Sequence, residues 1–357
     1  MNFEERKKAF IELGHSIDLA LKEVHNENEV SNDKLVRAIH EEHKNNPWFI
    51  PRFIISSLEG VHFMLKKKNL EKWLKPYEEK LNRNINPLRI GVIMAGNIPM
   101  VGFHDFMTIL LSGNKIIVKT SSKDNNLIRI LAEQLISIDN NFLDKIIFKE
   151  GTIGHPDGII ATGSNNSARY FEYYFEKYPN IIRKSRTSAA ILTGTETKSE
   201  LEALADDVLM YFGMGCRNVS KIFIPAGYKI EHLIDSFNKY RFVAEHNKYM
   251  NNYEYNKAIY LVNREPHFDN GFLLFKEDSA LYSPLSVVHY QRYNNNKDVW
   301  TKFLQAEKNN LQCVVGKSSA LDITVKFGEA QTPPPWKYAD NIDTMSFVTG
   351  LNNRNTP

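Results

Sequence analysis

The sequence predicts an α/β protein that has a parallel sheet and a helical N-terminal region. Two observations carry this prediction. Apolar residues recur at helical spacing through about the first 80 residues, and from Pro87 onward short apolar runs that end in glycine or serine alternate with longer helical stretches. Strands that alternate with helices in this way form βαβ units, whose strands lie parallel.

Residues 1–86 are expected to form an N-terminal helical region that packs on the domain after it. The apolar residues that indicate its first helix are Phe10, Leu13, Ile17 and Leu21. The basic run "MLKKKNLEKWLKP" (64–76) is most simply the solvated face of a helix, and a docking surface for an acidic partner is the alternative.

Residues 87–187 are expected to form a first α/β domain. Its predicted strands are "LRIGVIMAG" (88–96), "KIIVKTS" (115–121), "KIIFKEG" (145–151) and "DGIIATGS" (157–164), and helices at 100–111 and 125–138 separate the first three. Because the strands are parallel, their carboxyl ends should meet at one edge of the sheet, where ligands bind in such folds.

Residues 188–325 are expected to form a second α/β domain. A predicted strand, "SAAILTG" (188–194), is followed by a helix that continues through "SELEALADDVLMYFG" to Cys216, and then by the strand "KIFIPAG" (221–227). The tail, residues 326–357, contains three consecutive prolines and predicts an extended C-terminal arm that packs on the body or reaches a neighbouring subunit.

The composition excludes several classes of protein. A net charge of +3 over 357 residues, without a long block of like charges, argues against nucleic acid as a partner. Two cysteines, neither in a CxxC or Cys/His cluster, predict neither a disulfide framework nor a metal site. The charged N-terminal helix lacks the features of a signal peptide, and no run approaches the length of a membrane span. We therefore expect a soluble cytoplasmic protein.

Cys216 is the first candidate for chemistry, because it lies between Gly215 and Arg217 just before a predicted strand. Small neighbours leave room for a substrate to reach the sulfur, and a nearby cation favours the thiolate. The alternative is a small buried residue, which is the usual fate of a free cysteine.

Further candidates follow the predicted strands of the first domain. Asn97 comes after the first strand, Lys119 ends the second, and Gly163 and Ser164 stand between a strand and a helix whose free N–H groups would attract phosphate. Each also has an ordinary structural interpretation: a helix cap, a solvated strand end and an N-cap. Neither G-x-G-x-x-G nor G-x-x-x-x-G-K-[ST] is present.

The order of these features resembles the aldehyde dehydrogenase superfamily. The segments "GNIPMVGFHDFMTILLSGNKIIVKTSSKD", "YFGMGCRNVSK" and "YADNIDTMSFVTGL" are more closely similar to the acyl-CoA reductase (LuxC) family, from about Arg89 to the C-terminus, although this chain is shorter than the reductases of luminous bacteria. The resemblance implies an aldehyde-dehydrogenase-like fold in which 87–187 is a doubly wound NADP-binding domain. Residues 188–325 would be the catalytic domain, and the two would meet at a cleft that contains Cys216. A homo-oligomer is expected.

The resemblance also implies roles for single residues. Cys216 matches the nucleophile that takes the acyl group from a thioester, and Asn97 matches the asparagine that forms the oxyanion hole with the nucleophile's own N–H. Lys119 matches the lysine that contacts the adenosine ribose. Gly163 and Ser164 match the pair beside the pyrophosphate.

Two departures from the dehydrogenase pattern point to NADPH and to reduction. Ser122 stands where many NAD-dependent enzymes carry a ribose-binding glutamate, and with Lys123 it leaves room and charge for a 2′-phosphate. Ile182 stands where hydrolytic aldehyde dehydrogenases carry the glutamate that activates water. Without that base, an acyl-cysteine should survive long enough to receive hydride.

The sequence therefore predicts an NADPH-dependent reductase that converts an acyl thioester, acyl-CoA or acyl-carrier protein and most simply fatty acyl, to the aldehyde. An acyl-donor partner enzyme is a further expectation. An oxidising aldehyde dehydrogenase and an acyl-transferring subunit of a multienzyme complex are the alternatives. His104 and Asp105 are interpreted as structural. His155 is interpreted as shaping a turn, with a cofactor contact as the alternative. No role is assigned to Glu277, Asp278 or Ala280.

Overall fold

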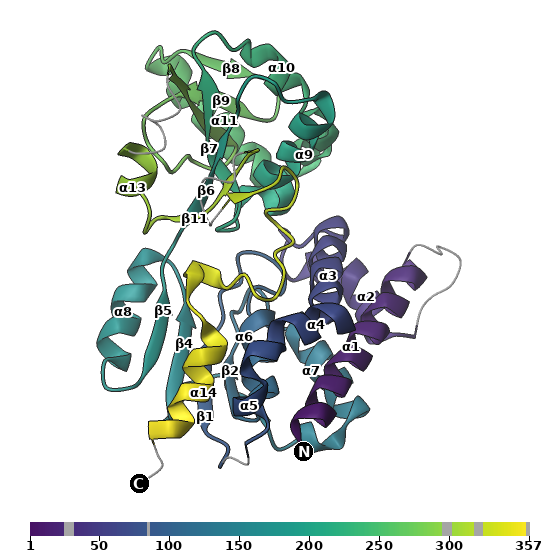
Figure 1. Ribbon diagram of the computed structural model, residues 1–357. Coiled ribbons are helices and arrows are strands. Elements are labelled where there is room, and N and C mark those ends of the chain that lie inside the picture. Colours follow the sequence, from purple (N-terminus) through teal and green to yellow (C-terminus); the bar gives the residue numbers. More distant parts are fainter. Residues whose placement is uncertain (25–31, 84–85, 295–301, 318–323, 355–357) are drawn as a thin grey trace. The chain divides into compact units, whose positions relative to one another are not determined.

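A computed structural model describes residues 1–24, 32–83, 86–294, 302–317 and 324–354. The chain forms two compact units (Figure 1). Unit one comprises Met1–Ser185 together with Pro334–Pro357, and unit two comprises Arg186–Pro333. The chain therefore leaves unit one once and returns to it at its C-terminal end.

The sheet of unit one has five parallel strands in the order β3-β2-β1-β4-β5. Their bounds are β1 Arg89–Ile93, β2 Lys115–Lys119, β3 Ile146–Phe148, β4 Gly158–Thr162 and β5 Asn180–Arg183. The chain adds β2 and β3 on one side of β1 and then β4 and β5 on the other. This is the doubly wound arrangement, so the prediction of a doubly wound parallel sheet is confirmed.

The two faces of this sheet bury different clusters. On β2, Ile116 and Val118 belong to the main core, which includes residues of α6 (Phe103–Leu111) and α7 (Leu127–Ile138). The intervening Ile117 belongs to a second cluster. Phe175, the last residue of α8 (Asn165–Phe175), packs against that cluster, and Figure 1 shows α8 on the opposite side of the sheet from α6 and α7. Alternation of side chains along each strand produces this division.

The N-terminal helices add a further layer to the main core of unit one. They are α1 Phe3–Val24, α2 Lys34–Glu41, α3 Pro51–Leu65, α4 Lys67–Leu74 and α5 Glu78–Leu81. Arg6 of α1 is buried and donates to the carbonyl oxygens of Met1, Leu81 and Leu111 at 2.9–3.0 Å. It thus satisfies carbonyls at the ends of α5 and α6 that have no partner within their helices.

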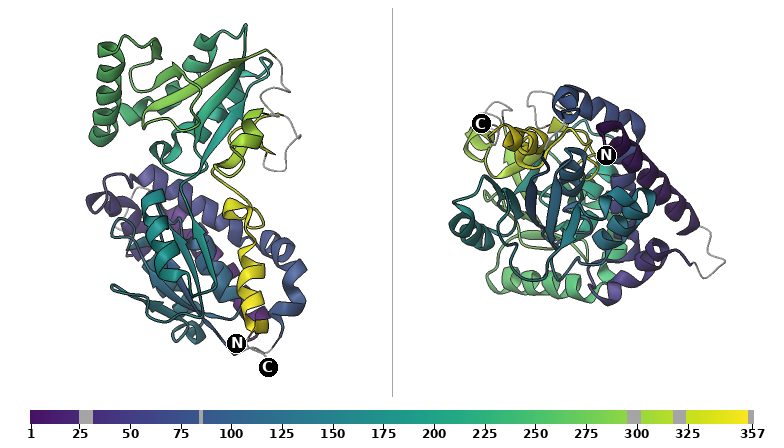
Figure 2. Two further views of the ribbon diagram at one scale, coloured as in Figure 1. Left: turned by 90° about the vertical axis from the view of Figure 1, so that its left-hand side faces the viewer. Right: turned by 90° about the horizontal axis from the view of Figure 1, so that it is seen from below.

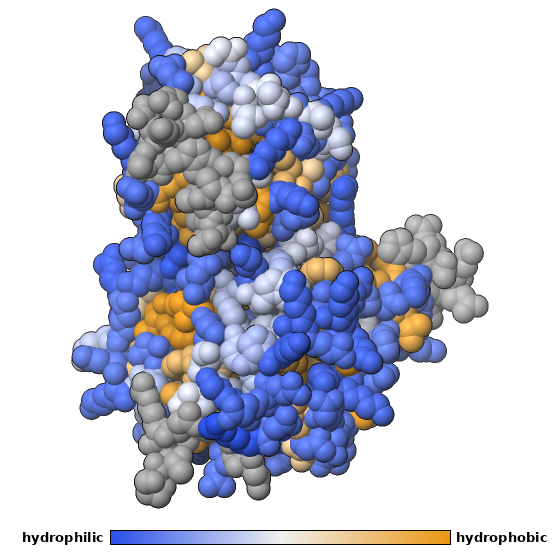
Figure 3. Space-filling model, viewed as in Figure 1, coloured by the Kyte–Doolittle hydropathy of each residue, from blue (hydrophilic) through white to orange (hydrophobic). Residues whose placement is uncertain are grey.

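The basic run of residues 64–76 lies mainly on α4, which is amphipathic. Lys67 and Lys68 are exposed, whereas Leu70, Trp73 and Leu74 are buried. Figure 3 shows hydrophilic residues over the exposed side of α4 and α5. The lysines therefore form a solvated helix face.

The C-terminal segment differs from the extended arm that the sequence predicts. Its residues Thr344–Arg354 form helix α14, which lies along unit one (Figures 1 and 2). Met345, Val348 and Leu351 are buried in the same core cluster as the N-terminal helices. The prediction of an extended conformation was wrong for α14, because the prolines indicate only the first part of the segment. Of the two predicted positions, the structure shows packing on the body. Residues 355–357 of the predicted arm lie outside the described residues.

Unit two has a seven-stranded sheet in the order β12-β11-β6-β7-β10-β9-β8, in which every pair is parallel except β8 and β9. The strands are β6 Thr187–Ile191, β7 Val219–Pro225, β8 His267–Asp269, β9 Leu274–Glu277, β10 Val287–Tyr293, β11 Leu311–Val315 and β12 Thr324–Val325. The α-helices of its described residues are α9 Lys198–Leu209, α10 Ile230–Asp235, α11 Asn247–Val262 and α13 Leu304–Ala306. Within the described ranges, no helix is long and apolar enough to cross a membrane.

Candidate active site

Cys216 lies in a tight turn between α9 and β7 of unit two. The Asn218 N–H donates to the Gly215 carbonyl oxygen at 3.0 Å, so Cys216 and Arg217 occupy the centre of the turn. The Cys216 side chain is half-buried. The helix before it ends at Leu209, earlier than the predicted helix that continued to Cys216.

A left-handed stretch replaces the end of the predicted helix. Tyr211, Phe212 and Gly213 have φ angles of 54°, 56° and 78°. Such angles are uncommon for aromatic residues. Packing holds Phe212 in this conformation, since its ring lies 4.4 Å from the His246 ring and 5.6 Å from the Tyr249 ring, measured between centroids. Strained backbone of this kind is often found at functional sites.

Asn218 fixes the turn, although no sequence motif marks it as a site residue. Its Oδ1 accepts from the Gly215 N–H at 2.7 Å. Its Nδ2 lies 2.9–3.2 Å from three carbonyl oxygens at the end of α9, those of Asp207, Val208 and Met210. One buried amide therefore ties the cysteine turn to the helix that precedes it. Its place two residues after the cysteine was the only available signal.

The two cysteines differ in accessibility. Cys313 in β11 is 2% exposed, and burial raises the pKa of its thiol, although the Arg217 charge and a contact with the Ser188 hydroxyl oppose that rise. The Ser188 Oγ lies 3.2 Å from the Cys313 Sγ and donates to the Cys216 carbonyl oxygen at 3.2 Å. Of the two thiols, the half-buried Cys216 is the better placed to meet a substrate.

The remaining predicted site residues lie in unit one, and the parallel register brings them to one edge of its sheet. Ile93 of β1 pairs with Lys119 of β2 and with Ala161 of β4. Asn97, the Ser122–Lys123 turn and the Gly163–Ser164 junction follow these three strands. They therefore gather at the carboxyl edge where the strand order reverses, which is the usual ligand position in this type of sheet.

Asn97 is exposed and lies in the loop between β1 and α6. The N-cap of α6 is Gly102, and Met100 has a left-handed φ of 62°. The helix predicted from residue 100 therefore begins at Phe103, and the interpretation of Asn97 as a helix cap is excluded.

The turn after β2 carries Ser122 and Lys123. Both are exposed, whereas Lys119 at the strand end is half-buried. The Ser121 Oγ accepts from the Lys123 N–H at 3.2 Å and closes the turn. Asp124, the acidic residue of this segment, is buried. The turn thus exposes a hydroxyl and an ammonium group without a carboxylate, a combination that suits an anionic ligand.

Gly163 and Ser164 form the junction between β4 and α8. A Cβ atom at Gly163 would lie 2.8 Å from the Ser167 Cβ and 2.9 Å from the Phe171 ring, so glycine is required there. Ser164 is the N-cap of α8 and accepts from the Ser167 N–H at 3.2 Å. The N-cap interpretation is therefore confirmed, and it is compatible with a phosphate at the exposed helix start.

Of four other residues that the sequence singled out, three make side-chain contacts within unit one and the fourth lies in a strand. Asp105 forms a buried ion pair with Arg183, and His104 contacts the Pro335 carbonyl oxygen at 2.8 Å through Nε2. His155 Nδ1 lies 3.0 Å from the Tyr178 hydroxyl. Ile182 is half-buried in β5 and pairs with Ala161. In the part of the chain that the structure describes, no cluster of His, Cys, Asp or Glu could hold a metal ion.

Comparison with known proteins identifies the family. The sequence model of the acyl-CoA reductase (LuxC) family matches residues 49–233, slightly more than half of the chain. The chain belongs to the acyl-CoA reductase (LuxC) family. It is also 24% identical over 218 residues to a long-chain acyl-protein thioester reductase of Photorhabdus laumondii, an alignment that covers 56% of this chain and 45% of that protein. The chain thus matches less than half of the length of this relative.

Solved structures confirm the predicted fold. The indole-3-acetaldehyde dehydrogenase AldA of P. syringae, solved with NAD+ and IAA, is 12% identical, with a TM-score of 0.63 over 91% of this chain and 74% of that chain. An aldehyde dehydrogenase from Bacillus cereus, solved with NAD+, is 13% identical. Its TM-score is 0.60, over 90% of this LuxC-family chain and 73% of the Bacillus chain. The chain has the aldehyde dehydrogenase fold.

Proposed function

We propose that this protein reduces an acyl thioester to the aldehyde with NADPH, through an acyl-cysteine at Cys216. The observation that carries the proposal is the Cys216 turn, which presents the more accessible of two thiols just after a left-handed stretch, in a chain of the LuxC family. The name of the Photorhabdus relative supports a fatty acyl group, with acyl-CoA or an acyl-protein as donor.

Two residues have chemical roles in this reaction. The Cys216 thiolate attacks the thioester carbonyl carbon, the carbon–sulfur bond of the donor breaks, and the donor leaves as a thiol, so that the acyl group is left on Cys216. The Asn97 amide and the Cys216 N–H donate to the oxyanion that forms during this attack. Donors of this type typically lower the activation free energy by about 3 kcal/mol. NADPH, when bound, supplies the hydride that reduces the acyl group.

Ile182 supports reduction over hydrolysis. An acyl-cysteine reacts slowly with water unless a positioned base removes a proton. The position that carries this base in hydrolytic relatives is occupied here by an aliphatic side chain in β5, next to Arg183, whose guanidinium is engaged by Asp105. The oxidising alternative would need another base. The acyl-transfer alternative would not need Lys119 or the Gly163–Ser164 junction.

Mass spectrometry of protein incubated with a panel of acyl thioesters, without NADPH, tests the proposal. Wild-type protein should gain one acyl group at Cys216, and the adduct should persist until NADPH discharges it as aldehyde. Cys313→Ala should behave like wild type, whereas Cys216→Ala should form no adduct. An adduct on Cys313 alone would overturn the assignment, and rapid hydrolysis of the wild-type adduct without NADPH would restore the oxidising alternative.

The cofactor preference has its own test in the turn after β2. Ser122 and Lys123 are exposed there, so a glutamate at position 122 would place a negative charge where we propose the 2′-phosphate. Ser122→Glu should therefore reduce the ratio of kcat/KM for NADPH to that for NADH by tenfold or more, about 1.4 kcal/mol. Equal use of both nucleotides by wild-type protein would contradict the proposed role of this turn.

A further inference from the structure

Asp124 is a buried carboxyl directly after the exposed Ser122–Lys123 turn. It is 5% exposed. Its Oδ2 accepts from the Met100 N–H at 2.8 Å, and its Oδ1 has no hydrogen-bond partner among the described residues. Burial of a carboxyl with one unsatisfied oxygen costs stability, so the single side-chain hydrogen bond to Met100 is the contact through which Asp124 can act.

Met100 is the strained residue of the loop that carries Asn97. It is 5% exposed and has a φ of 62°, a conformation that costs a residue with a side chain of this size about 1–3 kcal/mol. The carboxyl of Asp124 pairs the N–H of this residue. Asp124 therefore holds in place the bend that lies three residues after Asn97.

The two segments also touch through their backbones. A Cβ atom at Gly96 would lie 2.6 Å from the Ser121 Cβ and 3.1 Å from the Asp124 nitrogen. The Met94 N–H donates to the Lys119 carbonyl oxygen at 3.0 Å and continues the strand pairing into the loop. Because the contact leaves no space, movement of one segment displaces the other.

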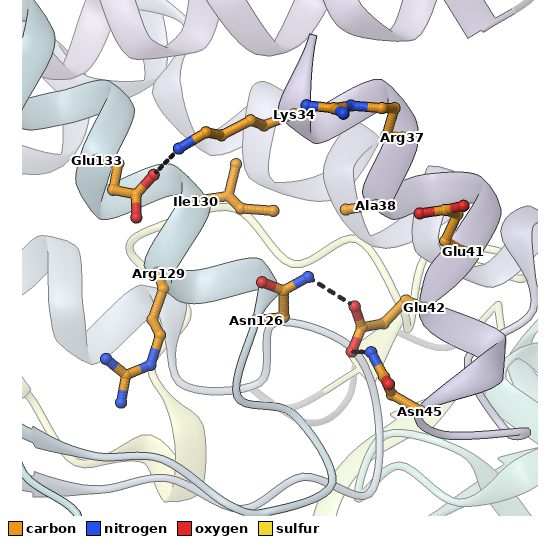
Figure 4. Close-up of a pocket in the computed structure, with 10 residues that line it drawn as sticks. All are labelled: Lys34, Arg37, Ala38, Glu41, Glu42, Asn45, Asn126, Arg129, Ile130 and Glu133. Atoms are coloured by element: carbon orange, nitrogen blue, oxygen red, sulfur yellow. Dashed lines mark hydrogen bonds and ion pairs between the residues drawn. The ribbon is translucent and has the colours of Figure 1, made fainter. Parts of the chain in front are cut away.

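Two residues of the N-terminal region hold the segments beside Asp124 and Met100. The Asn46 Nδ2 donates to the Lys123 carbonyl oxygen at 3.0 Å, and the Ser57 Oγ donates to the Pro99 carbonyl oxygen at 2.8 Å. Neighbouring Glu42 accepts from the Asn126 side chain at 2.9 Å, and both line the hollow between α2 and α7 (Figure 4). The contacts at Lys123 and Pro99 lie one residue from the two ends of the Asp124–Met100 hydrogen bond, which joins the two segments directly.

The electrostatic surroundings of Asp124 make this link sensitive to charge. Burial raises the pKa of Asp124 to about 7, the Met100 N–H opposes that rise, and the negative charge of Glu42 adds to it. The hydrogen bond to Met100 is stronger when the carboxyl is ionised.

We propose that Asp124 is a positioning residue that links the cofactor-binding turn to the Asn97 loop, so that nucleotide binding and acylation depend on the same carboxyl. This inference rests on the proposed function, which assigns the nucleotide to Ser122–Lys123 and the oxyanion to Asn97. Asp124 itself touches neither substrate nor cofactor in this scheme. It acts through Met100 on one side and through the turn that it ends on the other.

Three variants test the link. Asp124→Ala removes the acceptor for the Met100 N–H, Asp124→Asn keeps an oxygen that can accept it, and Ser112→Ala is the control. Ser112 is buried in the same unit, at the opposite end of β2, where its Oγ donates to the Ile109 carbonyl oxygen at 2.7 Å. The measurements are the NADPH dissociation constant by fluorescence titration and the rate of Cys216 acylation without NADPH by quenched mass spectrometry.

Asp124→Ala should weaken NADPH binding and slow acylation together, each by about tenfold or more, as expected for loss of a hydrogen bond to a charged group. Asp124→Asn should recover most of both losses. Ser112→Ala should lower the unfolding temperature and change neither quantity. If Asp124→Ala changes only one of the two, or if Ser112→Ala changes both, the link is refuted. Wild-type protein that neither binds NADPH nor forms the adduct would instead overturn the proposed function, and this inference with it.

Discussion

At the scale of single residues, Asn218 determines whether Cys216 is presented correctly. Asn218→Ala would leave the Gly215 N–H and three carbonyl oxygens at the end of α9 without this buried partner. We expect it to lower the free energy of unfolding by about 1–3 kcal/mol and to slow alkylation of Cys216 by iodoacetamide at least tenfold. Thermal unfolding and timed mass spectrometry measure the two effects.

Asn256→Ala is the matched control for this experiment. Asn256 is also buried in unit two, and its Nδ2 donates to the carbonyl oxygens of Asn252 and Leu285 at 2.9 and 3.0 Å, with no contact to the cysteine turn. It should cost similar stability and leave the alkylation rate of Cys216 unchanged. If both variants slow alkylation equally, Asn218 is a general stability residue and not a positioning one.

Sequence patterns could indicate the residues of the site but not the conformations that hold them. A cysteine between Gly215 and Arg217, and the polar residues after three strands, were visible as candidates. The left-handed conformation of Tyr211 and Phe212 was not, because aromatic residues seldom adopt it and nothing local indicates it. At Phe212 this conformation is held by ring contacts with His246 and Tyr249, which lie more than 30 residues further along the chain.

At the scale of secondary-structure elements, two glycines give a direct test of how α1 packs on α3. A Cβ atom at Gly14 of α1 would lie 2.9 Å from the Leu65 Cβ, whereas a Cβ atom at Gly60 of α3 would meet nothing within 4 Å. Both lie inside helices, where alanine is intrinsically favoured by about 1 kcal/mol. Gly60→Ala should therefore stabilise the protein by up to that amount.

Gly14→Ala should instead destabilise the protein by about 1–3 kcal/mol, because the added methyl group forces the two helices apart. Urea unfolding of both variants beside wild type provides the comparison. Stabilisation by Gly14→Ala equal to that by Gly60→Ala would show that the helices do not pack as closely as the structure indicates.

Four of the five strands of unit one could be predicted from sequence, because each is a short apolar run between turn residues. The fifth, β5, was not predicted, since only Ile181 and Ile182 in it are apolar. Helix boundaries could not be predicted. The stretch "LADDVLMYFG" continues the helical spacing of α9, yet the helix ends at Leu209. There the Asn218 Nδ2 donates to carbonyl oxygens that would accept from backbone N–H groups if the helix continued. A side chain from beyond the helix therefore decides where it stops, which local periodicity does not reveal.

At the scale of the whole molecule, the return of the C-terminal segment to unit one was the feature least accessible from sequence. Its contacts join residues that are far apart in the chain. The Trp73 indole donates to the Tyr338 hydroxyl at 2.7 Å, and the Arg183 guanidinium donates to the Thr344 hydroxyl at 3.0 Å beside the Asp105 ion pair. Local patterns carry no information about partners more than 150 residues away.

This topology makes unit one depend on the last segment of the chain. Met345 and Val348 of α14 are fully buried in its core, and each such side chain contributes roughly 1.5–3 kcal/mol. Removal of residues 334–357 would also leave the Trp73 N–H without its hydroxyl acceptor and Arg183 without Thr344. The combined loss is comparable with the total stability of a typical domain, about 5–15 kcal/mol. A chain that ends at Pro333 should therefore retain the fold of unit two and lose that of unit one.

Hydrogen exchange followed by mass spectrometry tests this dependence, because it measures the two units separately. In the truncated chain, peptides from β1, β2 and β4 should exchange rapidly, whereas peptides from β6 and β7 should stay protected.

Met345→Ala should lower the stability of unit one by about 2–5 kcal/mol, a typical loss for truncating a buried methionine. Ile342→Ala, at a side chain that is 37% exposed in the same segment, should change it by about 0.5 kcal/mol or less. Full protection of β1 and β2 in the truncated chain would show that Met1–Ser185 folds without the returning segment. Equal losses for the two point variants would show that α14 does not bury Met345 in the core.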